Sequence, residues 1–171
     1  MISKDFKVTL SQPFPFSEDN EDALIGAVLI DPSVLPGARL IVEPKDFYVS
    51  INGQVWLTLC KMSDQGLDID VVTVDAFLDE NSRQHAAPSP RDVAKNEIDA
   101  RLFRYTGACP TALNWETYAE IVRRDSIART CIRMYLRAIE LLVTNGLDIQ
   151  EMLDKTIEAL RKYQEELSDG N

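Results

Sequence analysis

This chain of 171 residues ends in two long stretches in which apolar residues recur with a helical period. The first runs over residues 114–145, with Asn114 suited to the N-cap, and the second over residues 148–167. Positions in the second stretch alternate steps of four and three, as in helices packed along one another. They are Ile149, Leu153, Thr156, Leu160, Tyr163 and Leu167. Because only residues 144–148 connect the stretches, we predict an antiparallel helical hairpin over residues 113–168.

A first helix is expected at residues 18–30. Ser17 can cap it, and its first turn is acidic, which suits the positive end of a helix dipole. The following residues are apolar apart from Gly26, so periodicity alone equally allows a buried strand. The cap and the acidic turn favour a helix, which Asp31 and Pro32 end.

More short helices are expected before the hairpin. One over residues 34–42 must be interrupted or delayed by Pro36-Gly37. Another carries an apolar stripe and is closed by Gly66. The stripe consists of Val55, Trp56, Leu59 and Met62. The β-branched run 71–74 favours a strand by propensity, but Asp70 is a good N-cap and the run shares a helical face with later apolar residues, so we predict a helix.

Residues 81–91 are polar and rich in proline and serine, which predicts a loop, and a helix that Gly107 stops is expected over residues 92–106. No strand is expected anywhere, so the predicted class is all-α, a globular head of short helices followed by a long antiparallel helical hairpin. The expected divisions are an extended lead-in (1–16), the head (17–112), the hairpin (113–168) and the start of a linker or tail (169–171).

The charge balance argues against a nucleic-acid-binding chain. Acidic residues outnumber basic ones by 28 to 18, for a net charge of −10, whereas proteins that neutralise phosphates show a basic surplus. No apolar run approaches the roughly 18 to 20 residues that cross a bilayer. The amino terminus lacks the pattern of a secretory signal. We therefore expect a cytoplasmic protein whose partners are proteins.

The sequence lacks the residues of a catalytic or metal centre. No glycine is followed by lysine, so no P-loop is encoded, and an enzyme is not expected. His85 is the only histidine and lies in the predicted loop. Asp68 and Asp70 are two residues apart, but Asp70 is better explained as a helix cap than as a catalytic carboxylate. The three cysteines are widely spaced, as expected for reduced thiols. No cofactor is expected.

Arg129, Arg133 and Arg137 follow one another at steps of four on one helix face. Such a stripe needs counter-charges, and Asp154 and Glu158 on the returning helix could supply them. The stripe is then either a solvated face with pairs inside the hairpin or a binding face for an acidic partner or a neighbouring subunit.

Apolar residues of the hairpin exceed what one seam between two helices needs. They occur on both sides, at Ile127, Ile132, Ile139, Met152 and Ile157. This surplus predicts self-association, in which these residues and the three arginines form the protein interface.

Three blocks of the chain resemble a known family. The central block consists of Pro44, Asp46, Phe47, Tyr48, Asn52, Val55, Trp56, Leu59, Met62, Gly66, Ile69, Asp70, Val72, Thr73 and Val74. The block before it holds Ala23, Leu24, Gly26, Leu29 and Asp31, and the block after it holds Pro110, Asn114, Tyr118, Ala119, Ile121, Val122 and Arg123. Together they resemble the amino-terminal domain of DnaB-type replicative helicases, from about Pro13 to Leu167.

The chain departs from this family at several places. The family usually has histidine where Asn52 stands and glutamine near Asp22. A Gly-Gly-x-x-Tyr-Leu passage is replaced by residues 94–103, which contain no glycine, and Pro36-Gly37 disturbs the second helix. These differences indicate a divergent member, with a host, a phage or another mobile element all open as its origin, and put its partner specificity in question.

The resemblance implies an assembly role without catalysis. In the family, hairpins pair between subunits and six domains form a collar that receives the carboxy-terminal domain of primase and influences loading, while the ATPase domain, absent from this chain, follows a linker. This chain is accordingly expected to form a dimer or a hexameric collar and to bind primase or a helicase loader, without binding nucleic acid directly. A free-standing adaptor or inhibitor with the same fold is the alternative. A third hypothesis, a small helical hydrolase or a DNA-binding regulator, is the weakest, because this sequence has neither a reactive group of side chains nor a basic helix that could read DNA.

Overall fold

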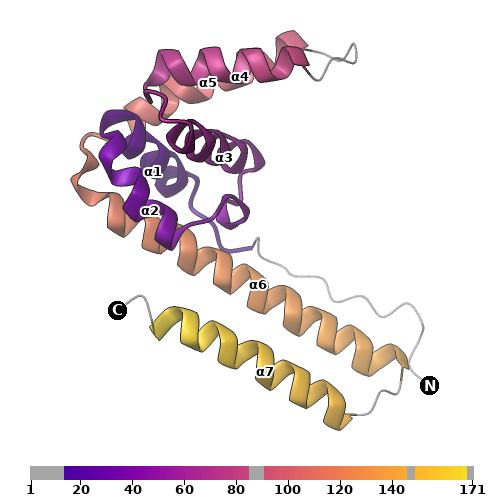
Figure 1. Ribbon diagram of the computed structural model, residues 1–171. Helices are drawn as coiled ribbons and strands as arrows, with labels where there is room; N and C mark the ends of the chain where they lie inside the picture. Colours follow the sequence, from indigo (N-terminus) through magenta and orange to yellow (C-terminus); the bar gives the residue numbers. More distant parts are fainter. Residues whose placement is uncertain (1–13, 85–90, 146–148, 169–171) are drawn as a thin grey trace. The chain divides into compact units, whose positions relative to one another are not determined.

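The computed structural model describes residues 14–84, 91–145 and 149–168. Within these ranges every regular element is a helix, which confirms the predicted all-α class (Figure 1). In chain order they are α1 (Glu18–Ile30), the 3-10 turn η1 (Pro32–Val34), α2 (Leu35–Ile41), η2 (Pro44–Asp46), α3 (Ser50–Asp64), α4 (Val71–Gln84), α5 (Arg91–Ala108), η3 (Ala112–Asn114), α6 (Trp115–Asn145) and α7 (Ile149–Ser168).

The chain divides into two compact units. The first unit is Phe16–Arg124, and the second unit joins Asp125–Asn171 to the chain up to Pro15. The border therefore falls inside α6. The first turns of α6 belong to the first unit because Ala119 and Val122 are buried in its core.

Helix α1 is buried on nearly every side in the first unit. Leu24, Ile25 and Val28 are fully buried, which explains why the apolar residues of α1 follow no single face. At its start the Ser17 hydroxyl accepts a hydrogen bond from the Asn20 amide at 3.4 Å, and acidic residues fill the first turn. The prediction of a helix over a strand is confirmed.

Two glycines let other helices approach α1 and α2 closely. A Cβ atom on Gly26 would collide with the main-chain carbonyl oxygen of Tyr105 in α5, and one on Gly37 would lie 2.7 Å from the Trp115 ring. Pro36 stands in the first turn of α2, where its missing N–H is harmless. The effect expected of Pro36-Gly37 is thus a small one: the helix predicted from residue 34 begins at Leu35 and is not interrupted.

The junction between α3 and α4 follows the prediction. Gly66 has φ 67°, the left-handed conformation that closes a helix. The Asp70 carboxylate accepts hydrogen bonds from the amides of Val72 and Thr73, each at 2.8 Å. This cap, together with the complete burial of Val74, holds the β-branched run in a helix against its propensity.

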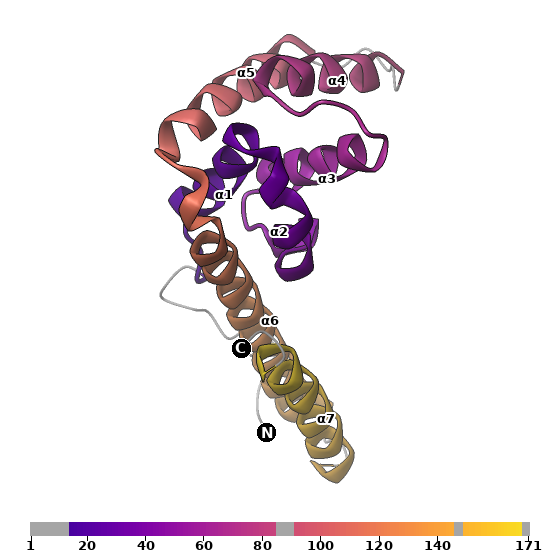
Figure 2. The ribbon, with the colours of Figure 1, turned by 60° about the vertical axis from the view of Figure 1, so that its left-hand side comes forward.

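Two predicted boundaries were wrong. Residues 81–84, expected to begin a loop, form the last turn of α4, and α5 continues through Gly107 to Ala108. Both views show α4 and α5 side by side (Figure 1 and Figure 2). Gly107 keeps a helical backbone, because glycine permits a left-handed stop but does not impose one.

In the second unit, the later part of α6 and α7 run antiparallel, which confirms the predicted hairpin (Figure 1). Among the described residues, no single helix has both the length and the apolar character needed to cross a bilayer. Helix α1 and residues 32–41 meet these requirements only when they are taken together, and the two segments are bent by 112° relative to each other.

Candidate functional site

Large apolar side chains remain exposed on both helices of the hairpin. On α6, Tyr135 is 47% exposed and Ile139 is 40% exposed. On α7, Leu153 is 44% exposed and Ile157 is 46% exposed. Each pair is four residues apart, so each forms a short stripe along its helix. We call these four residues the hairpin surface, and exposed apolar stripes of this kind are typical of protein interaction sites.

The structure distributes the predicted interface residues over different environments. Ile139 and Ile157 are part of the hairpin surface. Ile132 is half-buried and precedes Tyr135 of that surface by three residues. Ile127 is buried. The side chain of Met152 lies outside the described residues.

The three arginines of the predicted stripe also differ from one another. Arg129 is only 3% exposed, and its Nη1 donates a hydrogen bond of 2.9 Å to the carbonyl oxygen of Pro15. Arg133 is exposed, with its guanidinium carbon 5.4 Å from the centre of the Phe14 ring. Arg137 is exposed and donates to Glu140 at 2.7 Å. The stripe is therefore not a uniformly solvated face.

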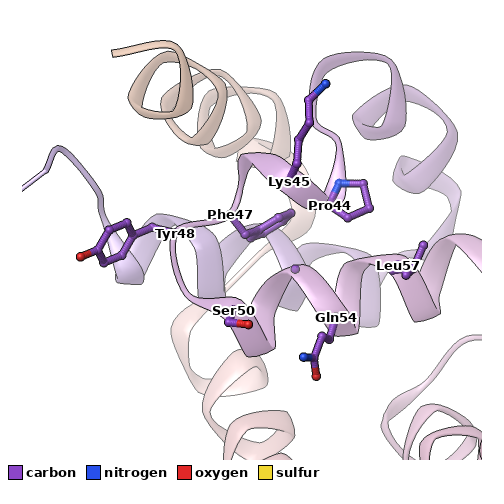
Figure 3. A pocket seen from close by; sticks show the side chains of 8 residues that line it. Pro44, Lys45, Phe47, Tyr48, Ser50, Gln54 and Leu57 are labelled. Atoms are coloured by element: carbon purple, nitrogen blue, oxygen red, sulfur yellow. The ribbon is translucent and has the colours of Figure 1, made fainter. Parts of the chain in front are cut away.

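A shallow groove of about 420 Å³ lies in the first unit, where η2 meets α3 (Figure 3). One side is formed by Ser50, Gln54 and Leu57, which recur at helical spacing along α3. Pro44 and Phe47 face them from the preceding turn (Figure 3). Sequence reasoning missed this groove, although three of the residues that line it, Pro44, Phe47 and Tyr48, belong to the central block that carries the family resemblance.

The floor and one end of the groove have identifiable causes. A Cβ atom on Gly53 would lie 2.6 Å from the carbonyl oxygen of Pro44, so the floor is formed by main chain that only glycine allows to approach. At the end, the ring of Tyr48 stacks on that of Phe16 with centroids 4.3 Å apart. Both rings are about two-fifths exposed, at 42% for Tyr48 and 40% for Phe16.

A buried carboxylate from another helix fixes the start of α3. Both oxygens of Glu21 in α1 accept main-chain hydrogen bonds, from the Tyr48 amide at 2.6 Å and from the Val49 amide at 3.2 Å. Asn52 donates to the same carboxylate at 3.2 Å. These bonds hold the two residues that lead into α3, and they position Tyr48 at the end of the groove.

Asp22, next to Glu21, is a second buried carboxylate. It accepts a hydrogen bond of 2.9 Å from Asn52, and the Arg104 Nε lies 2.5 Å from its other oxygen. Burial raises the pKa of Asp22, while the hydrogen bond and the arginines oppose that rise. Tyr105 donates to the Asn52 side-chain oxygen at 2.7 Å, and its own pKa is raised by burial. The cluster is a structural network that joins α1, α3 and α5.

The remaining candidates for chemistry have structural explanations or lie outside the described residues. Asp70 is a helix cap, as predicted, and Asp68 is exposed. His85 lies outside the described residues. Cys60, Cys109 and Cys131 are free thiols, and burial raises the pKa of the first two. In the ranges that the structure covers, no three metal-binding side chains gather.

Comparison with known proteins gives a consistent result. The family model described as the DnaB-like helicase N-terminal domain matches residues 14–124. The replicative DNA helicase DnaB of Geobacillus stearothermophilus is 32% identical over 151 residues, which cover 88% of this chain and 31% of that protein. The replicative DNA helicase DnaC of Bacillus subtilis is 27% identical over 146 residues, 84% of this chain and 30% of that protein. The chain thus spans about a third of the length of these curated relatives.

The fold is also found among solved structures. The N-terminal domain of DnaB helicase from Mycobacterium tuberculosis superposes with a TM-score of 0.68 at 22% sequence identity, covering 92% of this chain and 99% of that one. The likeness extends over the head and the hairpin, whereas the family model ends at residue 124. Because that model matches well over half of the sequence, the chain belongs to the DnaB-like helicase N-terminal domain family.

Proposed function

We propose that this chain is a non-catalytic assembly domain of a cytoplasmic replicative DNA helicase. It self-associates through the hairpin, as a dimer or within a hexameric collar, and it receives the carboxy-terminal domain of a primase or a helicase loader. Family membership supports the helicase context. The relatives themselves are named replicative DNA helicases.

The exposed stripes on both hairpin helices carry the proposal of self-association. In a hairpin that needed no partner, apolar residues would gather in one buried seam between the helices. Here Tyr135, Ile139, Leu153 and Ile157 each keep at least 40% of their surface exposed. Covering these side chains in a second copy gains about 25 cal/mol for each Å² of apolar surface removed from water.

The proposed interface comprises the hairpin surface with its sequence neighbours. Ile132 and Arg137 extend the two-residue stripe of α6, and Met152 belongs with α7. Ile127 and Arg129 are buried within the protomer, so we propose that they support this surface from inside. Arg133 follows Ile132 directly and belongs to the exposed part of α6.

The molar mass of the full chain in solution tests this proposal. Sedimentation velocity over a dilution series is expected to give dimers or larger assemblies at micromolar concentration. Titration with the carboxy-terminal domain of the cognate primase is expected to shift the boundary further. A monomer at high micromolar concentration that ignores primase contradicts the proposal.

A further inference from the structure

Residues Phe14 and Pro15 lie against α6. The carbonyl oxygen of Pro15 accepts a hydrogen bond from Arg129 at 2.9 Å, and the Phe14 ring faces the guanidinium of Arg133 at 5.4 Å. All four residues belong to the second compact unit. We call Phe14-Pro15 the amino-terminal strap.

The strap divides the arginine stripe into two parts. Arg129 is 3% exposed, and one face of Arg133 is turned to an aromatic ring. Arg137, one helical turn further on, is exposed and pairs with Glu140 of the same helix at 2.7 Å. An incoming group therefore reaches Arg137 directly, but reaches the covered face of Arg133 only when the strap moves.

The contacts that hold the strap are of a reversible kind. The cation–π contact is made by the exposed Arg133, and a contact of this kind changes an equilibrium by roughly two- to fivefold. The hydrogen bond from the buried Arg129 is charge-assisted and stronger, and it anchors the strap. Such a segment can be displaced by a partner that offers the arginines stronger counter-charges.

Helix α7 carries counter-charges with a matching period. Asp154 and Glu158 are exposed and lie four residues apart, the same spacing as the arginines along α6. Both acidic residues adjoin Leu153 and Ile157 of the hairpin surface in sequence. A second copy of the chain can thus present apolar and acidic side chains from one helix to the apolar and basic side chains of α6.

We propose that the amino-terminal strap regulates assembly: while seated, anchored by Arg129, it covers one face of Arg133, and its displacement opens that face to α7 of a second copy. The inference rests on the proposed self-association through the hairpin. It adds a closed state, held within the protomer, that competes with that association.

Opposite substitutions at Phe14 test the competition in the full chain. Phe14→Ala removes the cation–π contact and is expected to tighten self-association by roughly two- to fivefold for each strap released. Phe14→Trp offers a stronger partner for a cation and is expected to weaken self-association. Phe16→Ala is the matched control, because this nearby phenylalanine stacks on Tyr48 and not on the arginines. Dissociation constants come from sedimentation velocity, with circular dichroism to check helix content.

Arginine modification by phenylglyoxal, mapped by mass spectrometry at concentrations that keep the chain monomeric, reports the strap separately. Arg133 is expected to react faster in Phe14→Ala than in the wild type, with Arg137 unchanged. Equal modification rates in the two proteins would show that the strap does not cover the arginine. If the wild type dimerises and neither Phe14 variant changes the dissociation constant, the proposed regulation is wrong but the assembly role stands. If the wild type never associates, the assembly role, on which the regulation rests, is wrong as well.

Discussion

The side-chain amide of Asn52 donates a hydrogen bond of 2.9 Å to the carboxylate of Asp22. The resemblance described above implies histidine at position 52 and glutamine near position 22, so Asn52 is one expected departure and Asp22 lies at or beside another. The contact joins the two residues in the core. Asp22 brings a negative charge into the core, and Arg104 and Arg101 lie 2.5 Å and 3.6 Å from its oxygens.

The contact predicts that the two positions depend on each other. Asn52→His and Asp22→Gln are each expected to destabilise the chain, because each leaves the other residue or the arginines without a fitted partner, at a cost of about 1–3 kcal/mol. The double variant is expected to recover part of that loss. Urea unfolding of all four proteins measures the coupling, and strictly additive losses would show that the two positions are independent.

Gly26 is expected to tolerate no side chain. Gly26→Ala places a Cβ against the main chain of α5, which must move, so a loss of about 1–3 kcal/mol is expected. Gly107→Ala is the matched control in α5, because nothing lies within 4 Å of a Cβ there. Alanine at this helical position should raise stability by up to about 1 kcal/mol. Thermal unfolding compares the two, and similar effects of both substitutions would contradict this account of the α1–α5 contact.

Asp70 is expected to contribute a stability that acid removes. Hydrogen bonds from the amides of Thr73 and Val72 hold its pKa below the usual range. A carboxyl with a lowered folded pKa stabilises the fold above its unfolded pKa, about 3.9 for Asp, and loses that contribution as the pH falls through the folded value. Asp70→Asn keeps an acceptor but cannot titrate. The melting temperature of the wild type should exceed that of Asp70→Asn most at neutral pH, and a gap that stays constant down to pH of about 2 would count against the cap.

A charge placed on the hairpin surface is expected to weaken self-association. Ile139→Asp and Ile157→Asp each put a carboxylate where the proposed interface needs an apolar side chain, and a loss of about tenfold or more is expected. Leu113→Asp is the control, since Leu113 is 87% exposed and belongs to the first unit. Sedimentation equilibrium measures the three constants. An equal loss in the control would indicate a general charge effect in place of an interface.

Much of the fold could be predicted because local signals and the apolar pattern agreed. The stripe ending in Met62 and the left-handed Gly66 defined α3, and Asp70 identified α4 even though the β-branched run favoured a strand. Each of these signals acts within a few residues. The end of α4 was missed because residues 81–84 are polar, and a polar stretch before a run rich in proline and serine is typical of a loop.

The groove and the buried network could not be predicted from spacing. Glu21 accepts a hydrogen bond from the Tyr48 amide, just before α3, from 27 residues away in sequence, and Tyr105 reaches Asn52 across 53 residues. In the sequence, Glu21 was one of several acids in a helix start, with nothing to distinguish the buried carboxylates from the exposed ones. Arg129 was likewise predicted to lie in a surface stripe, while its burial depends on tertiary packing and a contact from Pro15.

Helix α6 passes without interruption through the border at Arg124 and Asp125. A protein cut there would lose the ladder of main-chain bonds that crosses the cut, stranding up to four carbonyl groups on one piece and up to four amides on the other. Attempts to isolate the head should therefore retain α6 to its natural end, and shorter fragments invite fraying that would be mistaken for an intrinsic weakness of the head.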